Sequence, residues 1–185
     1  CFILFSQIFF SKIKIIYPSL TIFASILPLY FVATSSEYRL SRIETWLSRK
    51  CDLGIDLLGD CFQLNQSRIA ISSGGLFGLG PGTSRARWGS LPNSYSDFIS
   101  SIIGEEYGFF GLFLLVMAFF ILISTTFLIA IREKNEIKKL ISVGFGSWIF
   151  FQTVINLGGA VGIVPITGIV LPFVSYGSSA MISIF

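Results

Sequence analysis

The sequence predicts an all-α membrane protein, a multi-pass transmembrane helical bundle with one large extracytoplasmic loop. Of its 185 residues, 53% are hydrophobic and 12% are charged, and the mean hydropathy of +0.79 is too high for an ordinary water-soluble domain. The net charge of +3 is small and the Lys and Arg residues are scattered. The clustered basic face that nucleic acid requires is missing from the sequence, so nucleic acid is excluded as a partner.

Four apolar runs predict the membrane-spanning helices. They cover residues 15–35, 109–131, 140–161 and 173–185. The run over 109–131 has no charged residue, and a helix rising about 1.5 Å per residue would extend it over roughly 34 Å, enough to cross a hydrocarbon core. The earlier run over 15–35 contains Pro18 and Pro28, which predict kinks.

Two polar side chains, Gln152 and Asn156, lie within the run over 140–161. They are four residues apart and therefore share one helix face. Two interpretations stay open, a hydrogen-bonding contact between helices and the wall of a polar cavity. The contact between helices is favoured, because polar residues in helical bundles usually serve that way.

Basic residues at the ends of the apolar runs predict the orientation. They are Lys12 and Lys14 before the first run, and Arg132, Lys134, Lys138 and Lys139 between the second and the third. Because Lys and Arg accumulate in cytoplasmic loops, both groups are expected in the cytoplasm. The segment 36–108 is then expected to be an extracytoplasmic loop.

The segment 36–108 is far longer than an ordinary connection, and ordered loops of such length usually carry function. Cys51 and Cys61 could pair in an oxidising exterior, although Cys1 leaves the cysteine count odd. The sequence contains no His. Ser-His and Cys-His nucleophilic chemistry and imidazole metal sites are therefore excluded within this chain.

A glycine-rich stretch, "SGGLFGLGPGTSRARWG", occupies residues 73–89. Glycines such as Gly80 and Gly82 let backbone amides approach an anion, and Arg85 and Arg87 add fixed positive charge. These features indicate a phosphate cradle. Tight packing or turn formation is the slightly favoured alternative, because the stretch lacks the Lys-Ser/Thr ending of a P-loop.

Three carboxylates, Asp97, Glu105 and Glu106, come just before the apolar run over 109–131. Pro92 and the residues after it are typical of a helix start, and Ser94 with Asp97 matches a capping box. On composition alone, Asp97 is therefore interpreted as a helix cap. Glu105 and Glu106 are expected at a solvated membrane boundary.

Two long motifs resemble one protein family. The stretch "QSRIAISSGGLFGLGPGTSRARWGSLPNSYSDFISSIIGEEYGFFG" resembles the large extracytoplasmic loop of the SEDS proteins (FtsW, RodA and SpoVE), and "NLGGAVGIVPITGIVLPFVSYGSSAMI" is similar to the family's closing signature. The variant "SRARWGSLPN" is closer to the FtsW branch than to RodA. The chain begins at Cys1 inside an apolar stretch and ends without a polar tail. These ends indicate a fragment, and the resemblance implies that residues 1–185 are the C-terminal part of one larger SEDS membrane domain.

The resemblance implies a peptidoglycan glycosyltransferase of the bacterial cytoplasmic (inner) membrane, which polymerises lipid II into glycan strands during cell division or elongation. The partners it implies are a class B penicillin-binding protein, other division proteins and membrane lipids. The family's essential aspartate lies in a His-Thr-Asp-Phe motif, which here is Tyr95-Ser96-Asp97-Phe98. The resemblance thus transfers the catalytic role, that of general base, to Asp97, and it reverses the preference for a helix cap.

The expected chemistry agrees with these residue types. Joining two sugars from a lipid pyrophosphate donor requires a base on the acceptor hydroxyl, which Asp97 can supply, and positive charge near the departing pyrophosphate. The substrate-binding candidates are Arg85, Arg87, Gly80, Gly82, Ser96 and Glu106. A divalent cation between Asp97 and the phosphates would serve the same electrostatic end, but the sequence shows no dedicated ligand cluster.

The chain departs from the family pattern at Tyr95, Ser100 and Ser178, where the family usually has His, Phe and Gly. Two other functions stay open. A lipid-linked precursor flippase would use a polar cavity lined by Gln152 and Asn156, although the repeat symmetry usual in transporters is not evident. A catalytically silent scaffold for division proteins would be consistent with the departures.

Overall fold

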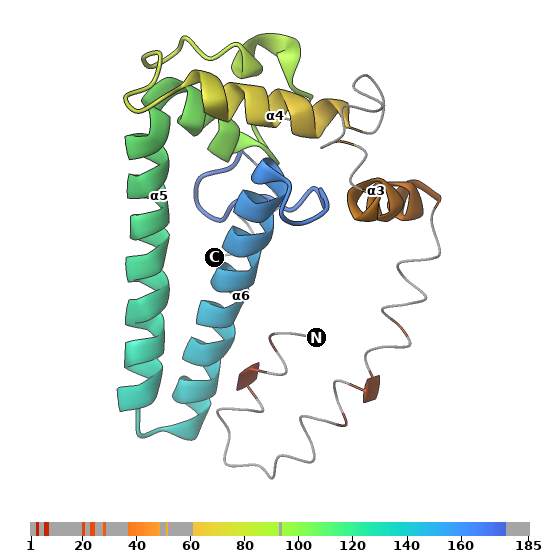
Figure 1. Ribbon diagram of the computed structural model, residues 1–185. Coiled ribbons are helices and arrows are strands. Elements are labelled where there is room, and N and C mark those ends of the chain that lie inside the picture. Colours follow the sequence, from red (N-terminus) through yellow and green to blue (C-terminus); the bar gives the residue numbers. More distant parts are fainter. Residues whose placement is uncertain are drawn as a thin grey trace. The chain divides into compact units, whose positions relative to one another are not determined.

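The computed structural model describes residues 37–48, 51, 61–92 and 94–176, together with a few single positions before residue 37. The elements are α3 (Glu37–Leu47), α4 (Phe62–Ser73), the single π-type turn η1 (Ala86–Ser90), α5 (Ile99–Arg132) and α6 (Glu136–Val161) (Figure 1). No strand occurs among the described residues, and the predicted all-α class is confirmed for them. The chain divides into two compact units, Cys1–Leu40 with Ala118–Phe151 and Ser41–Met117 with Gln152–Phe185.

In the first unit, the second half of α5 and the first half of α6 form a helical hairpin. Asn135 caps α6, because its Oδ1 accepts a hydrogen bond from the amide of Ile137 (3.0 Å). Farther along the hairpin, a Cβ built on Gly146 would lie 3.0 Å from Oγ1 of Thr126. The small residue thus permits close approach of the two helices, as in membrane bundles.

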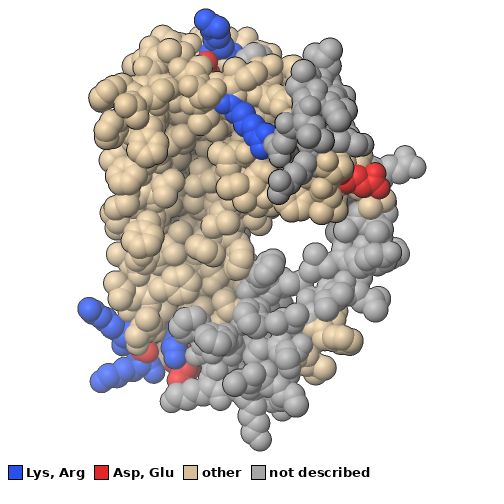
Figure 2. Space-filling view, in the orientation of Figure 1, with Lys and Arg blue, Asp and Glu red and all other residues tan. Residues whose placement is uncertain are grey.

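Both helices of this hairpin are long and apolar enough to cross a membrane. Only 6% of the most apolar window of α5 is buried, which a core helix of a soluble domain would not show. Charged side chains gather at the turn between α5 and α6 (Figure 2). Most exposed side chains along α5 are apolar instead, among them Phe109, Phe113, Leu114, Phe120, Ile121 and Ile129. Such a surface suits contact with lipid.

The helix bounds differ from the predicted ones at several points. Helix α5 contains the predicted run over 109–131 but begins earlier, at Ile99, and α6 contains the run over 140–161. The predicted helix start at Pro92 is wrong, because residues 94–97 form a turn. Residues 172–174 also form a turn, so no helix begins at Phe173. The rest of that run, and most of the run over 15–35, lies outside the described residues.

Helix α5 is interrupted at Gly108, whose φ of 65° and ψ of −158° are not helical. Because the helix is interrupted, nearby backbone groups lack hydrogen-bond partners within α5. The glycine-rich loop supplies these partners instead. The hydrogen bonds are Leu79 N to Glu105 O (3.0 Å), Gly80 N to Glu106 O (3.0 Å), Phe109 N to Gly75 O (2.9 Å) and Phe110 N to Leu76 O (3.2 Å). The glycine-rich loop therefore satisfies the backbone groups on both sides of the break in α5.

In the second unit, α4 lies across the first turns of α5 (Figure 1). A buried cluster joins α4, η1, the start of α5 and the end of α6, and consists of Ala70, Ala86, Leu91, Phe98, Ile102 and Ala160. Ser67 adds a polar contact to this core, since its hydroxyl lies 2.7 Å from Oγ of Ser101 and donates to the carbonyl of Ala160 (2.6 Å). The core ends at Phe98, the residue next to Asp97.

Candidate active site

Asp97 lies in the turn before α5 and not within the helix. Because α5 begins at Ile99, Asp97 cannot take the third helical position that a capping box with Ser94 requires, so the predicted cap is wrong. Its neighbour Phe98 is buried and anchors the turn, whereas the side chains of Ser96 and Asp97 are half-buried. Among the described residues, none donates a hydrogen bond to the Asp97 carboxylate.

Asn156 of α6 fixes the backbone at Asp97. Its Nδ2 donates to the carbonyl of Asp97 (2.8 Å) and to that of Ile169 (2.7 Å). The residue is 4% exposed, and an amide nitrogen has two hydrogens, so both are used within the protein. Asn156 therefore serves mainly as a contact between segments, although its partners lie in a turn and a loop and not on another helix. Gln152, the other polar residue of that face, is half-buried.

The loop that follows α6 runs beside the carboxylate. A Cβ built on Gly168 would lie 3.5 Å from Oδ2 of Asp97, and the φ of Gly168 is +71°, which other residues rarely adopt. A small cavity of about 10 Å³ lies between Asp97, Asn156 and Gly168. A cavity of this size has room for about one water molecule. A sugar substrate would therefore have to approach Asp97 from its exposed side.

Residues 84–88, called the arginine turn below, are bound to the side chain of Glu105. This carboxylate accepts three hydrogen bonds, from Ser84 Oγ (2.6 Å), Arg85 N (3.1 Å) and Ala86 N (3.1 Å). Glu105 is only 2% exposed, so the expectation of a solvated boundary is wrong. The sequence showed no signal for this contact, because the partners lie about twenty residues earlier and match no motif.

Glu106 is also buried, and it faces Arg87. Its Oε1 lies 3.9 Å from a guanidinium nitrogen of Arg87, and the residue is 7% exposed. Oε1 has no hydrogen-bond partner among the described residues, and the Arg87 guanidinium is the positive charge beside it. The guanidinium also lies 5.7 Å from the centroid of the Trp88 ring, within the range of a cation–π contact. Glu106 therefore supports Arg87, and the guanidinium remains at the surface.

Tyr95 connects the arginine turn to the turn that carries Asp97. Its hydroxyl donates to the carbonyl of Arg87 (3.3 Å), and its own carbonyl accepts a hydrogen bond from the amide of Tyr176 (3.0 Å). Tyr95 therefore joins the arginine turn, eight residues earlier, to the distant segment at Tyr176. The tyrosine, which departs from the pattern that the resemblance implies, has a defined structural partner.

The glycines of the glycine-rich loop serve mainly in packing. Cβ atoms on Gly74 and Gly78 would collide with the backbone of α5. Gly80 has a φ of +108° and its amide donates to Glu106 O (3.0 Å), so this amide is already engaged. Gly82 has a φ of +79° with open space around it. Of the two predicted cradle glycines, only Gly82 faces such space.

The described residues contain no group of three or more His, Cys, Asp or Glu side chains that could hold a metal ion. Glu105 is bound to the arginine turn and Glu106 faces Arg87. Neither is placed to join Asp97 as a cation ligand. The described carboxylates therefore do not fit a divalent-cation site at Asp97.

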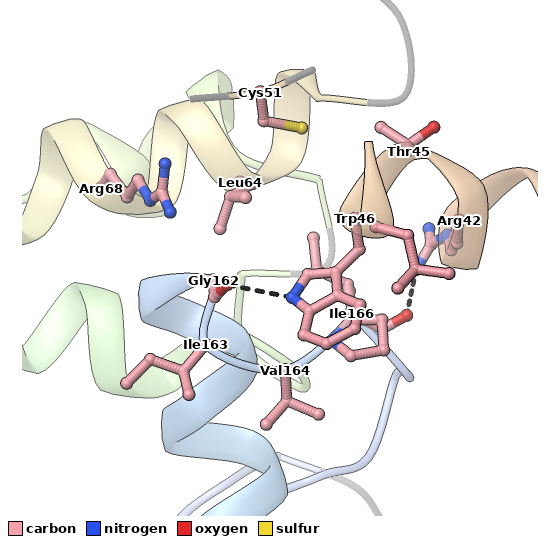
Figure 3. A pocket seen from close by; sticks show the side chains of 12 residues that line it. Arg42, Thr45, Trp46, Cys51, Leu64, Arg68, Gly162, Ile163, Val164 and Ile166 are labelled. Atoms are coloured by element: carbon pink, nitrogen blue, oxygen red, sulfur yellow. Dashed lines mark hydrogen bonds between the residues drawn. The ribbon is translucent and has the colours of Figure 1, made fainter. Parts of the chain in front are cut away.

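A larger cavity of about 560 Å³ lies between α3, α4 and the loop after α6 (Figure 3). Arg42 and Trp46 of α3 hold this loop, because they donate to the carbonyls of Ile166 (3.0 Å) and Gly162 (3.2 Å). None of the predicted site residues lines this cavity. Ile166 borders both cavities, so α3 supports the loop that faces Asp97.

A disulfide bond joins Cys51 to Cys61, with the two Cα atoms 5.2 Å apart. The pairing that the sequence allowed is therefore formed. Cys61 is fully buried at the start of α4. The bond ties the segment after α3 to α4.

Fold and site together define a helical membrane protein in which Tyr95 links an arginine-bearing turn to the turn of Asp97, whose carboxylate accepts no hydrogen bond from the described residues. The chain belongs to the FtsW/RodA/SpoVE family, described as "Cell cycle protein", whose sequence profile matches residues 1–185. It is 43% identical over 126 residues to "Probable peptidoglycan glycosyltransferase FtsW" of Enterococcus hirae, which covers 68% of this chain and 32% of that protein. It is 40% identical over 184 residues to the protein of the same name from Buchnera aphidicola subsp. Schizaphis graminum (strain Sg), covering 96% and 50%.

A third relative is "Stage V sporulation protein E" of Bacillus subtilis (strain 168), 40% identical over 147 residues that cover 80% of this chain and 39% of that protein. A solved structure, "Structural coordination of polymerization and crosslinking by a peptidoglycan synthase complex", contains a chain with a TM-score of 0.67 and 25% identity. The similarity covers 99% of this chain and 49% of the other. The chain thus spans about a third to a half of the length of these relatives.

Proposed function

We propose that this chain is part of a peptidoglycan glycosyltransferase that polymerises lipid II into glycan strands during cell division or elongation. The observation that carries the proposal is the Asp97 carboxylate, which has no hydrogen-bond donor among the described residues while Asn156 fixes its backbone. A fixed, unbonded carboxylate suits a general base, because proton transfer requires direct reach to the substrate hydroxyl. The names of the FtsW relatives support the same activity.

The proposed reaction is a displacement at the anomeric carbon of the donor sugar. Asp97 takes the proton of the acceptor hydroxyl, and the hydroxyl oxygen forms the new bond to that carbon. The bond between the carbon and the pyrophosphate oxygen breaks, and the lipid pyrophosphate leaves with the electron pair. Arg85 and Arg87 would offset the negative charge that develops on the leaving group. The surface position of both arginines supports this role.

We place the protein in the bacterial cytoplasmic membrane as a multi-pass protein, with the segment 36–108 outside. Two observations support this orientation. The turn between α5 and α6 is rich in Lys and Arg (Figure 2), which is typical of the cytoplasmic side. The disulfide between Cys51 and Cys61 precedes α5, and such bonds persist in oxidising exteriors. Asp97 would then face the side on which the cell wall is built.

A class B penicillin-binding protein, other division proteins and membrane lipids are the proposed partners. The similar solved chain belongs to a structure described as a peptidoglycan synthase complex that coordinates polymerization and crosslinking. A polymerase of this kind needs a crosslinking partner, because glycan strands alone do not form a network. The apolar exposed surface of α5 offers room for lipid or for a partner helix.

The decisive experiment compares Asp97→Asn and Asp97→Glu in the full-length protein, with expression, thermal stability and glycan polymerisation measured together. Asn cannot accept the proton, so polymerisation should fall by roughly 10² to 10⁴ while the protein stays folded. Glu keeps the carboxylate but moves it by one methylene, so it should also be impaired. A folded Asp97→Asn protein that polymerises normally would disprove the catalytic role.

The same assay separates the other two functions. A flippase would move the lipid-linked precursor across vesicle membranes without joining sugars, and its polar cavity is not supported, because Asn156 uses its amide within the protein. A silent scaffold would bind division proteins and show no polymerisation in the wild-type protein. Polymerisation by the wild-type protein that is lost in Asp97→Asn would exclude both.

A further inference from the structure

We propose that Glu105 is a positioning residue, whose buried carboxylate holds the arginine turn in the conformation that presents Arg85 and Arg87 to the pyrophosphate of the lipid-linked donor. The role of the two arginines rests on the proposed function. The contact between Glu105 and the turn does not, because it is visible in the structure itself. Glu105 would act through the backbone of the turn and would not touch substrate.

The geometry of Glu105 carries the first step. The residue is 2% exposed, so a substrate cannot reach its carboxylate. A buried carboxylate must be compensated by hydrogen bonds or by an opposite charge. Here the compensation comes from Ser84, Arg85 and Ala86, at 2.6 to 3.1 Å. Two of these donors are backbone amides, so the carboxylate restrains the main chain of the turn.

Ser84 extends this restraint to Arg87. Its hydroxyl donates to Glu105 and accepts a hydrogen bond from the amide of Arg87 (3.2 Å). Ser84 is fully buried, so water does not compete for these bonds. The backbones of both arginines are therefore tied, directly or through one hydroxyl, to the same carboxylate.

The other end of the arginine turn is tied to the turn of the proposed base. The hydroxyl of Tyr95 donates to the carbonyl of Arg87 (3.3 Å), and Tyr95 lies two residues before Asp97. A continuous series of contacts thus leads from Glu105 through the arginine turn to the segment of Asp97. Loss of the carboxylate should free the arginine turn and change the spacing between its guanidinium groups and Asp97.

Two variants and a matched control isolate this contact. Glu105→Gln keeps the size of the side chain but turns its nitrogen, a donor, towards groups that also donate. Ser84→Ala is milder, because it removes only the hydroxyl between Glu105 and Arg87. The control is Ser101→Ala, one helical turn before Glu105, which removes an equally buried hydroxyl whose partner is Ser67 and not the arginine turn.

The first measurement needs no enzymatic activity. Trypsin cleaves after arginine only where the backbone can open, so the cleavage rate after Arg85 and Arg87 reports how firmly the turn is held. In the folded full-length protein, Glu105→Gln and Ser84→Ala should each raise this rate, Glu105→Gln by about tenfold or more. Ser101→Ala should cleave like the wild type. An unchanged rate in both variants would overturn the restraint by Glu105.

The second measurement tests the role in catalysis by a double-mutant cycle. Glu105→Gln should lower kcat/KM for the lipid-linked substrate by about ten- to a hundredfold. In a protein that already carries Arg85→Ala and Arg87→Ala, the same change should add less than about twofold, because its effect passes through the arginines. A full effect in that background would overturn the positioning role. If the wild type does not polymerise at all, the proposed function fails, and the trypsin result still decides whether Glu105 holds the turn.

Discussion

Asn156 of α6 donates hydrogen bonds from one side-chain nitrogen to the carbonyl oxygens of Asp97 (2.8 Å) and Ile169 (2.7 Å). The first carbonyl belongs to the turn of the proposed base, and the second to the loop that brings Gly168 beside its carboxylate. One buried amide therefore holds both the turn of Asp97 and the loop beside its carboxylate in place. The side-chain oxygen of Asn156 has no partner among the described residues. The two donated hydrogen bonds therefore hold the amide group in place.

This relationship makes Asn156→Asp the most informative substitution in α6. The aspartate has nearly the same shape, but its carboxylate cannot donate and would face two carbonyl oxygens. Each lost buried hydrogen bond should cost about 1 to 3 kcal/mol of stability, and polymerisation should fall because the Asp97 backbone is released. Thermal unfolding and polymerisation of the full-length protein measure the two effects. Gln152→Ala, one turn earlier, is the control and should change both far less. Equal behaviour of the two variants would contradict the role of Asn156.

Gly108 should contribute strongly to the stability of the fold. Its φ and ψ lie in a region essentially restricted to glycine, which costs other residues about 1 to 3 kcal/mol. A Cβ there would also lie 2.7 Å from the carbonyl group of Leu76. We expect Gly108→Ala to lower the unfolding temperature and the yield of folded protein. Gly159→Ala is the matched control, since a Cβ there would meet no atom of the described residues within 4 Å apart from its own helix backbone and chain neighbours, and alanine favours a helix. A stable Gly108→Ala protein would contradict the break in α5.

Arg85→Ala and Arg87→Ala should raise the KM for the lipid-linked donor or lower kcat, without loss of membrane insertion. An exposed charge with no ligand would instead contribute only about 0 to 1 kcal/mol. Arg87→Ala should also lower stability, because it leaves the buried Glu106 without its ion pair. Steady-state kinetics and thermal unfolding of each variant measure these effects. Unchanged kinetics in the double variant would remove both arginines from the site.

The orientation can be tested by labelling single cysteines from outside the cell, in a background where the native cysteines are serine. Thr83→Cys, in the exposed part of the glycine-rich stretch, should react with a membrane-impermeant maleimide. Glu136→Cys, at the exposed start of α6, should react only after permeabilisation, and this substitution leaves every basic residue of the turn in place. Labelling of Glu136→Cys in intact cells would reverse the proposed topology.

The sequence by itself was sufficient for features that depend on local composition and spacing. The charge-free run over 109–131 lies within α5, because a long apolar segment must be helical to satisfy its backbone in lipid. The possible pairing of Cys51 with Cys61 is realised. Two long motifs were sufficient to indicate the family that the comparisons show.

The tertiary structure alone decided how the site is assembled. Local spacing favoured a helix cap for Asp97 and a solvated boundary for Glu105, and both interpretations were wrong. The bonds that matter run from Glu105 to residues about twenty positions earlier, and from Asn156 to Asp97 across 59 positions. Such contacts have no periodic signature in the sequence. They form because burial in the core removes water. Buried carboxylates, amides and the backbone groups of the interrupted helix are then stable only when they are hydrogen-bonded within the folded chain.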